Sequence, residues 1–434
     1  MKILFVSKEL MAGHVAYLLQ KEGHDVRLYI EEKDSRNCFD NLLPKSDNWK
    51  SDISWVGKDG LIVFDDTGYG KDQDKLRAEG YTVFGGSAKS EKLETNREFG
   101  QEVFKKNGLK TMPLKEFSNL DDAIVFAKQN PKPWVIKRSG KTSKFLTYVS
   151  KFDDGRDSIT LMKNYLNNKK TSKSKVALHE RIDGVEMGVA RYFNGKDWVG
   201  PIEFNIEHTF LMPGDIGPAT SEMGTLAWYS DDFSNKLYKE TLEPMTEYLK
   251  KTGFRGDFSL NCIVNKNGAF ILEATTRLGS PIVHLQSELH DSPWGEFMLA
   301  IARGESYDLK WKKGYGIVAL IAVPPFPYLS ASSQAITPFG MDIHFKNMTE
   351  DDWDHIHFDE IAKRRQTEHD QYFIADNKGY ILYVTDVAQT VLDAQKKVYE
   401  RTQKIIIPRM MYRNDIGKSF VETNQQKLIE WGYL

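Results

Sequence analysis

Cysteine is scarce in this sequence, and that scarcity excludes several kinds of protein. Among 434 residues, only Cys38 and Cys262 are cysteines. Two cysteines supply neither a disulfide framework nor a zinc-binding set, so a reducing cytosol is the natural compartment. We expect both thiols to lie in the hydrophobic core.

A large net charge is also missing. The chain carries 59 Lys and Arg against 61 Asp and Glu, which gives a net charge of −2 and a pI near 6.6. This balance argues against a general nucleic-acid-binding surface. The sequence has no run of about 18 apolar residues, and its first residues, MKILFVSKEL, lack the apolar core of a signal peptide. We therefore predict a cytoplasmic protein whose partners are neither nucleic acids nor membranes.

Several catalytic motifs are absent as well. The first predicted strand continues into SKELMAG and not into a G-x-G-x-x-G turn, so we predict no dinucleotide site there. The Walker A pattern is missing, and no serine stands in a G-x-S-x-G context. His355 and His357, which we expect on one strand face, have no evident third metal ligand.

What is present is the pattern of a globular α/β protein. Hydrophobic residues make up 40% of the chain and aromatic residues 12%, and the length is enough for roughly three domains. Residues 2–6 (KILFV) predict a strand buried on both faces, residues 12–24 a helix, and residues 25–30 a second strand. With further strands at 61–66 and 81–86, these segments predict an open parallel sheet.

The middle of the chain adds a helix and two strand pairs. We predict a helix from 88 to 107, and a strand at 133–140 that runs into the polar stretch KTSK. Residues 176–195 read as two strands around an Asp-Gly turn. Residues 258–279 read as an antiparallel hairpin that turns at an Asn-Gly pair. Near the C-terminus, residues 386–405 predict a helix.

A glycine-rich stretch, GDIGPATSEMGTLAWYS at 214–230, shows neither helical spacing nor an alternating apolar pattern. We therefore expect a loop. One interpretation is that its main-chain N–H groups approach a ligand closely. The other is a surface connection with ordinary turn chemistry, and composition does not decide between them.

Two charged positions are candidates for chemistry. Lys137 ends an apolar strand and precedes Gly140, Lys141 and Lys144, a combination of ammonium groups and free backbone that suits a polyphosphate; a solvated strand end is the alternative. Glu273 ends an apolar strand and needs a partner. That partner is either Arg277, four residues on, or Mg²⁺ bridging phosphates.

Six segments, taken in order, resemble phosphoribosylamine–glycine ligase, a family of the ATP-grasp superfamily. They are VFGGSAKSEKLETNREF, PWVIKRSG, HERIDGVE, GDIGPATSEMG, ILEATTRLGSP and YRNDIG. The resemblance implies an ATP-grasp fold of mixed α/β and α+β class with a Rossmann-like N-terminal domain. It places that domain at 1–88, the central domain at 89–310 with a lid at about 112–190, and a C-terminal α/β domain at 311–434.

The resemblance also implies ATP with Mg²⁺, or possibly Mn²⁺, as cofactors, and it assigns roles to individual residues. Those expected to bind the nucleotide are Arg97, Lys137, Lys144, Glu180, Arg181, Ile182 and Glu186. Those expected to hold the metal are Glu273 and Thr275. Those expected at the reacting groups are Arg277, Gly224 and Thr220, with Asp215, His208, Ser221 and Glu222 facing the substrates.

Departures from the family pattern bear on the second substrate. Thr209 and Phe210 stand where the family has a basic pair, and Ser280 and Ile282 replace two acids. Losing two cations removes charge suited to a sugar phosphate. The implied reaction joins a carboxylate, such as that of an amino acid, to an amine through an acyl phosphate, with release of ADP and phosphate, in a monomer or homodimer. Three hypotheses stay open: the named ligase, a ligase with a different acceptor, and a non-catalytic nucleotide-binding relative.

Overall fold

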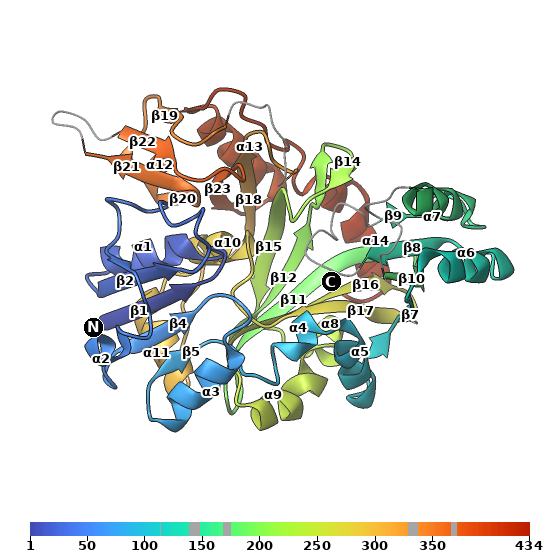
Figure 1. Ribbon diagram of the computed structural model, residues 1–434, viewed down its shortest axis with the longest axis horizontal. Helices are drawn as coiled ribbons and strands as arrows, with labels where there is room; N and C mark the ends of the chain where they lie inside the picture. The colour runs from blue at the N-terminus through green and yellow to red at the C-terminus, as the bar shows by residue number, and fades with distance from the viewer. Residues whose placement is uncertain (113, 139–147, 168–174, 329–336, 366–370) are drawn as a thin grey trace.

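A computed structural model describes residues 1–112, 114–138, 148–167, 175–328, 337–365 and 371–434 (Figure 1). The N-terminal sheet is parallel and has the order β3-β2-β1-β4-β5. Its strands are β1 (Lys2–Ser7), β2 (Asp25–Ile30), β3 (Lys45–Ser46), β4 (Leu61–Phe64) and β5 (Val83–Phe84). Every residue of β4 is buried, as expected for a strand covered on both faces. The predicted open parallel sheet is confirmed.

Short helices cover this sheet, and the predicted first helix is present. The helices are α1 (Gly13–Lys21), α2 (Ile53–Val56) and α3 (Gly70–Ala78). Helix α1 buries Val15 and Leu19 on the sheet and is followed by Gly23, whose φ of 86° suits a residue without a Cβ.

A second, smaller sheet projects from the body of the molecule, with α6 and α7 beside it at the right of Figure 1. We call it the lid sheet, and its order is β7-β10-β8-β9. Its elements are β7 (Leu114–Phe117), α6 (Leu120–Gln129), β8 (Trp134–Arg138), β9 (Tyr148–Val149), α7 (Arg156–Asn167) and β10 (Val176–Glu180). It has its own apolar core, in which Leu120, Trp134 and Met162 are buried.

The central sheet runs through the middle of the molecule in the order β20-β23-β18-β15-β12-β11-β16-β17-β6 (Figure 1). Its strands are β6 (Lys110–Thr111), β11 (Val185–Asn194), β12 (Trp198–Glu207), β15 (Gly224–Ser230), β16 (Arg255–Asn265), β17 (Gly268–Thr275), β18 (Tyr315–Ala322), β20 (Ile356–Phe358) and β23 (Tyr380–Ala388). Strands from both sides of residue 310 therefore share one sheet. The division of the chain into domains stays a proposal, and the sheets favour a lid at 114–180.

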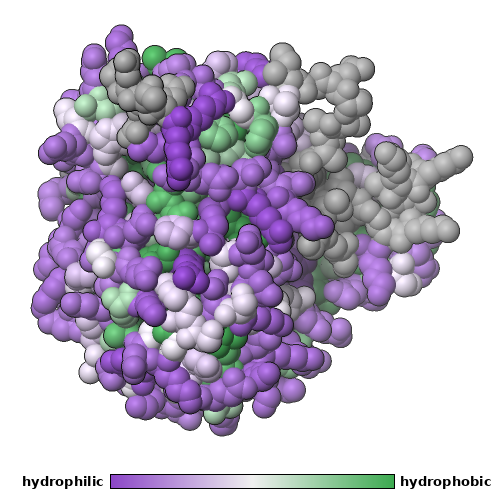
Figure 2. Space-filling view, turned by 60° about the vertical axis from the view of Figure 1, so that its left-hand side comes forward, coloured by the Kyte–Doolittle hydropathy of each residue, from purple (hydrophilic) through white to green (hydrophobic). Residues whose placement is uncertain are grey.

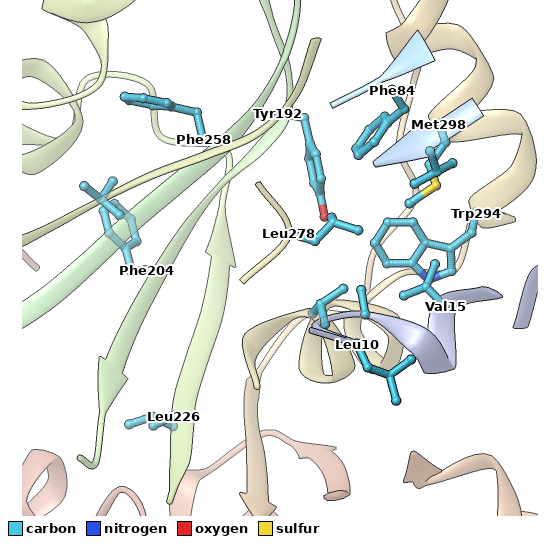
Figure 3. Close-up of a cluster of buried hydrophobic side chains, with 14 of the residues drawn as sticks. Leu10, Val15, Phe84, Tyr192, Phe204, Leu226, Phe258, Leu278, Trp294 and Met298 are labelled. Atoms are coloured by element: carbon cyan, nitrogen blue, oxygen red, sulfur yellow. The ribbon is translucent and has the colours of Figure 1, made fainter. Parts of the chain in front are cut away.

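Helices pack on both faces and at the ends of this sheet. They are α4 (Lys92–Thr95), α5 (Arg97–Lys106), α8 (Lys236–Glu240), η2 (Glu243–Met245), α9 (Thr246–Thr252), α10 (Ile282–Leu289), α11 (Trp294–Arg303), α12 (Glu350–Asp354), α13 (Val391–Thr402), η3 (Phe420–Asn424) and α14 (Gln425–Glu430). Figure 3 shows Tyr192 of the sheet directed toward Trp294 and Met298 of α11, with Leu278 beside it. This apolar cluster extends to Phe84 and joins the N-terminal sheet to the central one.

The C-terminal part adds a small sheet in the order β21-β22-β19-β24. Its strands are β19 (Asp342–Phe345), β21 (Ile361–Arg364), β22 (Gln371–Ile374) and β24 (Ile405–Ile406). The face seen in Figure 2 is mostly hydrophilic, and its hydrophobic side chains form separate patches. Within the described ranges, no helix is long and apolar enough to cross a bilayer.

Four sequence predictions need correction. The stretch 214–230 is not a continuous loop, because β14 (Ile216–Ala219) pairs with β13 (Phe210–Met212) and β15 lies in the central sheet. The predicted helix at 88–107 is broken at Asn96, which is extended with ψ of 96°. The predicted helix at 386–405 begins only at Val391, since residues 386–388 belong to β23. His355 ends α12 and does not share the strand of His357.

The predicted hairpin at 258–279 is confirmed as β16 and β17. The two strands predicted in 176–195 are also present, but they do not pair with each other. β10 belongs to the lid sheet and β11 to the central sheet. The short connection between them, at 181–184, is therefore the point where the chain passes from one sheet to the other.

Candidate active site

A narrow cavity of about 20 Å³ lies where the lid sheet meets the edge of the central sheet. Its lining residues are Arg97, Gln101, Met112, Leu114, Lys137, His179, Ile271 and Leu272. Apolar side chains from both sheets thus line one slot, and two cationic side chains line the same slot.

Lys137 and Arg97 reach this cavity from different elements. Lys137 is half-buried on β8, and burial lowers the pKa of its ammonium group, while Glu273 and Glu186 oppose that shift. Arg97 is the first residue of α5, where the Asn96 side chain accepts a hydrogen bond from the Phe99 N–H at 3.0 Å and so caps the helix. The break in the predicted helix therefore fixes the position of Arg97.

Glu273 faces these cations from β17. Its Oε2 lies 4.0 Å from Nη2 of Arg97, and both side chains stay accessible, at 53% and 36% exposure. Arg277 is not the partner of Glu273. Its Nε donates to Glu94 Oε1 at 3.0 Å and lies 3.7 Å from Asp66 Oδ1. Of the two partners considered for Glu273, Arg277 or Mg²⁺, Arg277 is therefore excluded.

A β-bulge sets the direction of Glu273. Near the turn, Cys262 pairs with Ile271, but beyond the bulge Asn261 pairs with Glu273, so Leu272 is the extra residue. An extra residue reverses the side-chain alternation of the strand after it. Glu273 is exposed in the cleft, and Leu272 before it lines the cavity.

The bulge also gives Glu273 a neighbour that the sequence did not predict, Asn261. Asn261 pairs with Glu273 across the strands, and its Nδ2 donates to Glu207 Oε1 at 2.8 Å. Counting back from the Asn-Gly turn would have paired Asn261 with Leu272, so only the observed register reveals this pair. Thr275 lies on the same strand, opposite Ser259. Carboxylate, amide and hydroxyl oxygens therefore lie on one face of the sheet.

Glu186, the residue expected at the ribose, lies at the start of β11 on the same side of the cleft. Solvent reaches its side chain, but surrounding protein groups displace much of its water. This desolvation, and then repulsion from Glu207, raise the pKa of Glu186 to about 7, while Lys137 opposes the shift. The carboxyl therefore titrates near neutral pH when no ligand is bound.

The residues expected at the hinge connect the lid sheet to the central sheet. The Arg181 N–H donates to the Pro133 carbonyl at 2.7 Å, and its guanidinium donates to the Ser150 carbonyl at 2.8 Å. Glu180 pairs with Lys132 at 2.6 Å. Ile182 is half-buried, and no partner for its N–H is present in the described parts of the chain.

His179, on β10, is buried beside the cavity. Burial, and then the charge of Lys137, lower the pKa of its imidazole to about 3. A neutral ring at this position adds an uncharged wall to the slot. Lys144 lies outside the described residues.

The residues of the glycine-rich stretch are held by the C-terminal segment YRNDIG. Arg413, 1% exposed, donates to Asp215 Oδ1 at 2.8 Å and to the Phe210 carbonyl at 3.1 Å. The Gly214 N–H donates to Asp415 Oδ2 at 2.8 Å, and Asp415 also binds Arg413. The sequence analysis includes the segment 412–417 but assigns no role to Arg413.

His208 and Gly224 lie at the base of the β13–β14 hairpin. His208 is buried, and its Nε2 accepts the Gly417 N–H at 3.1 Å. Burial, and then Arg413, lower the pKa of His208 to about 4, so the ring is neutral. Gly224 has φ of 154°, and a Cβ there would lie 2.4 Å from the Val318 carbonyl oxygen. Any larger residue would have to displace backbone.

The remaining predicted substrate residues are also engaged within the protein. The N–H and the hydroxyl of Thr220 both donate to the Thr209 carbonyl at 2.7 Å. Ser221 hydrogen-bonds the Tyr380 hydroxyl, and the buried Glu222 carboxylate accepts from the Thr225 hydroxyl. The roles predicted for these side chains in substrate binding stay predictions.

Arg277 lies where the N-terminal and central sheets meet. Burial acts to lower the pKa of its guanidinium, but the carboxylates of Glu94 and Asp66 more than offset this and raise it. Its side chain is 17% exposed. Any anion bound there would approach the acids that already hold Arg277.

Comparisons with known proteins agree with this geometry. The family model for the ATP-grasp (A) domain of phosphoribosylglycinamide synthetase matches residues 95–282. A phosphoribosylamine–glycine ligase of Halalkalibacterium halodurans is 23% identical over 355 residues, which cover 80% of this chain and 79% of that protein. One of Listeria monocytogenes is 25% identical over 353 residues, covering 79% and 80%.

Solved structures show the same fold. The crystal structure of phosphoribosylamine–glycine ligase from Thermotoga maritima superposes with a TM-score of 0.68 at 19% identity, over 96% of this chain and all of that chain (100%). A biotin carboxylase from Campylobacter jejuni, in complex with a β,γ-ATP compound, gives 0.62 at 13% identity over 100% and 97%.

Residues 95–282 thus match an ATP-grasp domain, and the chain as a whole has the ATP-grasp fold. Its sequence is similar to phosphoribosylamine–glycine ligases over about 80% of its length.

Proposed function

We propose that this protein is an ATP-dependent ligase that joins a carboxylate to an amine, as a phosphoribosylamine–glycine ligase does. One observation carries the proposal: Arg97, Lys137 and Glu273 meet across the cleft between the lid sheet and the central sheet. Two cations and an acid converge there and remain partly accessible. Such a set can bind the phosphates of a nucleotide together with a cation.

The nucleotide would lie along this cleft. Arg97 and Lys137 would bind the phosphates, joined by Lys144 from outside the described residues. The base would lie against the apolar side chains of Met112, Leu114 and Leu272, which line a slot that is itself too small to enclose it. The Arg181 N–H already donates to Pro133, and the Glu180 carbonyl lies 3.4 Å from His179 Nδ1. The Ile182 N–H is therefore the hinge group left to bind the edge of adenine. Glu186 would accept from the ribose hydroxyls.

The oxygen ligands around Glu273 fit a small hard cation. Over the described residues, no group of three or more His, Cys, Asp or Glu side chains is arranged to hold a metal alone. Mg²⁺ commonly uses one or two carboxylates together with substrate phosphates, so Glu273, with Asn261 and Thr275 nearby, suits Mg²⁺ or Mn²⁺. When bound, the cation would neutralise charge on the transferring phosphoryl group.

The reaction would proceed in two displacements. A carboxylate oxygen of the first substrate attacks the γ-phosphorus of ATP, the bond to the bridging oxygen breaks, and ADP leaves. The amine then attacks the acyl carbon, the C–O bond to phosphate breaks, and phosphate leaves with an amide formed. Arg97 and Lys137 would stabilise charge on the phosphates during the first step. Backbone groups of the 214–224 segment would face the acyl phosphate, and Arg277 would hold the carboxylate.

A second candidate is a ligase whose acceptor is less anionic than phosphoribosylamine. Arg277 already faces Glu94 and Asp66, so a doubly charged phosphate near it would be repelled more strongly than the singly charged carboxylate of the first substrate. Phe210, where the family has a cation, lies in β13. This surrounding favours an uncharged or cationic amine.

Steady-state assays with ATP and Mg²⁺ separate these functions. We expect ADP release that requires both a carboxylate and an amine. ADP release with glycine and phosphoribosylamine supports the named reaction. ADP release with other amines, but not with phosphoribosylamine, supports the second candidate. Nucleotide binding without turnover under every condition would contradict a ligase and leave a binding protein.

We also propose a cytoplasmic location and a monomeric or homodimeric state, with an amino acid or another carboxylate and an amine as substrates. Cys38 and Cys262 are both free and buried, which agrees with a reducing compartment.

A further inference from the structure

Two carboxyl groups are buried in the central sheet away from the nucleotide cleft. Glu203 on β12 is 2% exposed, and Asp257 on β16 is 3% exposed. Both strands flank β11, where Ala190 pairs with Glu203 and Tyr192 pairs with Asp257. Cross-strand partners share a face, so both carboxyl groups lie on the same face of the sheet.

One amide group bridges the two acids. Nε2 of Gln286, on α10, donates to Glu203 Oε2 and to Asp257 Oδ2, at 2.9 Å in each case. Gln286 is itself 1% exposed. Asn205 donates to the other oxygen of Glu203 at 2.9 Å, while Asp257 Oδ1 has no hydrogen-bond partner in the described structure.

No cationic side chain within the described ranges forms an ion pair with either acid. The groups that face them are Glu207 on β12, Tyr192 on β11, Tyr229 on β15 and Arg277 after β17. Arg277 already forms ion pairs with Glu94 and Asp66. Two unneutralised charges in such a site would be very costly, because each buried ion needs a partner.

We propose that Glu203 and Asp257, bridged by Gln286, hold one proton between them at neutral pH and act as positioning residues for the Arg277 segment. The link is α10, which begins at Ile282, just after residues 277–281, and packs on β15, β18 and β23. Gln286 ties this helix to the sheet through the two acids. The part of the proposal that concerns Arg277 rests on the proposed ligase function.

The titration of the pair agrees with this arrangement. Burial, and then repulsion from Asp257, raise the pKa of Glu203 to about 8. Burial raises the pKa of Asp257 to about 6, against the hydrogen bond from Gln286 and the charge of Arg277. The two groups interact strongly, so these values describe the pair. Between pH 6 and 8 it carries a single proton.

The raised pKa values of Glu203 and Asp257 determine how the stability of the fold changes with pH. An unfolded Glu titrates near its ordinary value, so the folded pair binds more protons than the unfolded chain between about pH 4.5 and pH 8. The stability that comes from this proton is complete below that window and is lost as the pH rises through about 8.

Infrared spectroscopy and thermal unfolding test the proton. Glu203→Gln keeps the shape but cannot ionise, and its amide oxygen keeps one of the two hydrogen bonds that Glu203 accepts. Glu243→Gln, an exposed residue of η2, is the matched control. We expect the difference spectrum of the wild type minus Glu203→Gln at pH 7 to show one buried carboxylic-acid band, and that of the wild type minus the control to show none. Glu360, whose buried carboxyl also has a raised pKa, contributes equally to all three proteins. We also expect the unfolding temperature of the wild type to fall by about 1.5 °C between pH 7 and pH 9, and that of Glu203→Gln to fall much less.

Gln286→Met tests positioning, since it removes the bridge at similar volume. We expect hydrogen exchange to rise at least about tenfold in residues 277–289 but not in α11, a readout that needs no substrate. In the ligation assay, we expect a lower kcat with an unchanged KM for ATP. Difference spectra of the wild type minus Glu203→Gln and of the wild type minus Asp257→Asn that both lack a carboxylic-acid band would overturn the shared proton. Unchanged exchange at 277–289 would overturn the positioning role, whether or not the protein proves to be a ligase.

Discussion

The nucleotide half of the candidate site, formed by Arg97, Lys137, Glu186 and Glu273, holds its charged groups loosely. The Arg97–Glu273 pair is separated by 4.0 Å and is more than a third exposed on each side. The loop half, formed by residues 208–224 with the segment 412–417, is different. Its central cation, Arg413, is fully buried and makes bonds of 2.8 to 3.1 Å.

This difference distinguishes charged groups that are free to bind a ligand from charged groups that stabilise the local structure. Exposed charges at 4 Å lose little when a phosphate or a cation replaces their present neighbours. A buried guanidinium with all its partners in place cannot change partners cheaply. We infer that the nucleotide half binds through its side chains, and that the loop half contributes mainly through the backbone that those side chains fix.

The largest effect should come from breaking the loop half. Arg413→Met leaves Asp415 and the Phe210 carbonyl without their buried donor, and we expect a loss of about 3 kcal/mol in the free energy of unfolding. Denaturant unfolding measures it, with Arg303→Met on the exposed side of α11 as the control. If Arg413→Met is as stable as the control, the loop half does not depend on this cation.

Breaking the nucleotide half should affect catalysis and leave stability intact. Glu273→Gln removes the charge proposed to hold Mg²⁺, so we expect kcat to fall about 100-fold or more. The unfolding temperature should stay within about 1 °C of the wild type, since Glu273 is exposed. Glu116→Gln on β7 is the control for ADP release, and equal rates in both variants would exclude Glu273 as the metal ligand.

Lys137→Ala tests the nucleotide half through ATP binding alone, without catalysis. Loss of one charge-assisted hydrogen bond to phosphate should weaken ATP binding roughly tenfold to hundredfold. Calorimetry with ATP and Mg²⁺ measures the change, and Lys128→Ala on α6 provides a control on the same lid. ATP bound as tightly as by the wild type would contradict the proposed cleft.

Acid should destabilise the loop half through His208. His208 is neutral in the fold with a pKa of about 4, whereas an unfolded histidine titrates near 6.5. The unfolded chain therefore binds the extra proton as the pH falls from 6.5 to 4, and stability falls through that window. At pH 5.5, the loss from this residue should be about 1 kcal/mol.

His208→Asn tests this, since an amide oxygen can still accept from Gly417 without titrating. We expect a smaller drop in unfolding free energy between pH 7 and pH 5.5 than in the wild type, and the exposed His344→Asn should behave as the wild type does. Identical pH profiles for all three proteins would show that His208 is not buried as described.

The smallest effect concerns the second substrate. Glu222 is buried and accepts from Thr225, and Glu222→Gly would remove both its carboxylate and that hydrogen bond. We expect a change of about fivefold in the ratio of kcat/KM between two amines, since one such bond contributes about 1 kcal/mol. Glu222→Gln separates charge from shape, and an unchanged ratio in both variants would exclude Glu222 from amine selection.

The amino-acid sequence alone determined the N-terminal parallel sheet, the hairpin of β16 and β17, and the presence of Lys137 and Glu273 at strand ends. These follow from local patterns: continuous apolar runs, an Asn-Gly turn, and a charge at the end of a buried strand. The resemblance of ordered segments to a known family added Arg97 and the lid.

Only the tertiary structure decided which of these residues meet. The bulge at Leu272 turns Glu273 into the cleft and sets Asn261 opposite it, and Arg277 pairs with acids more than 180 positions earlier in the sequence. Arg413 reaches back about 200 positions to hold Asp215. Local sequence cannot specify such pairs, because a one-residue shift in register or a contact between distant segments depends on the packing of the whole chain.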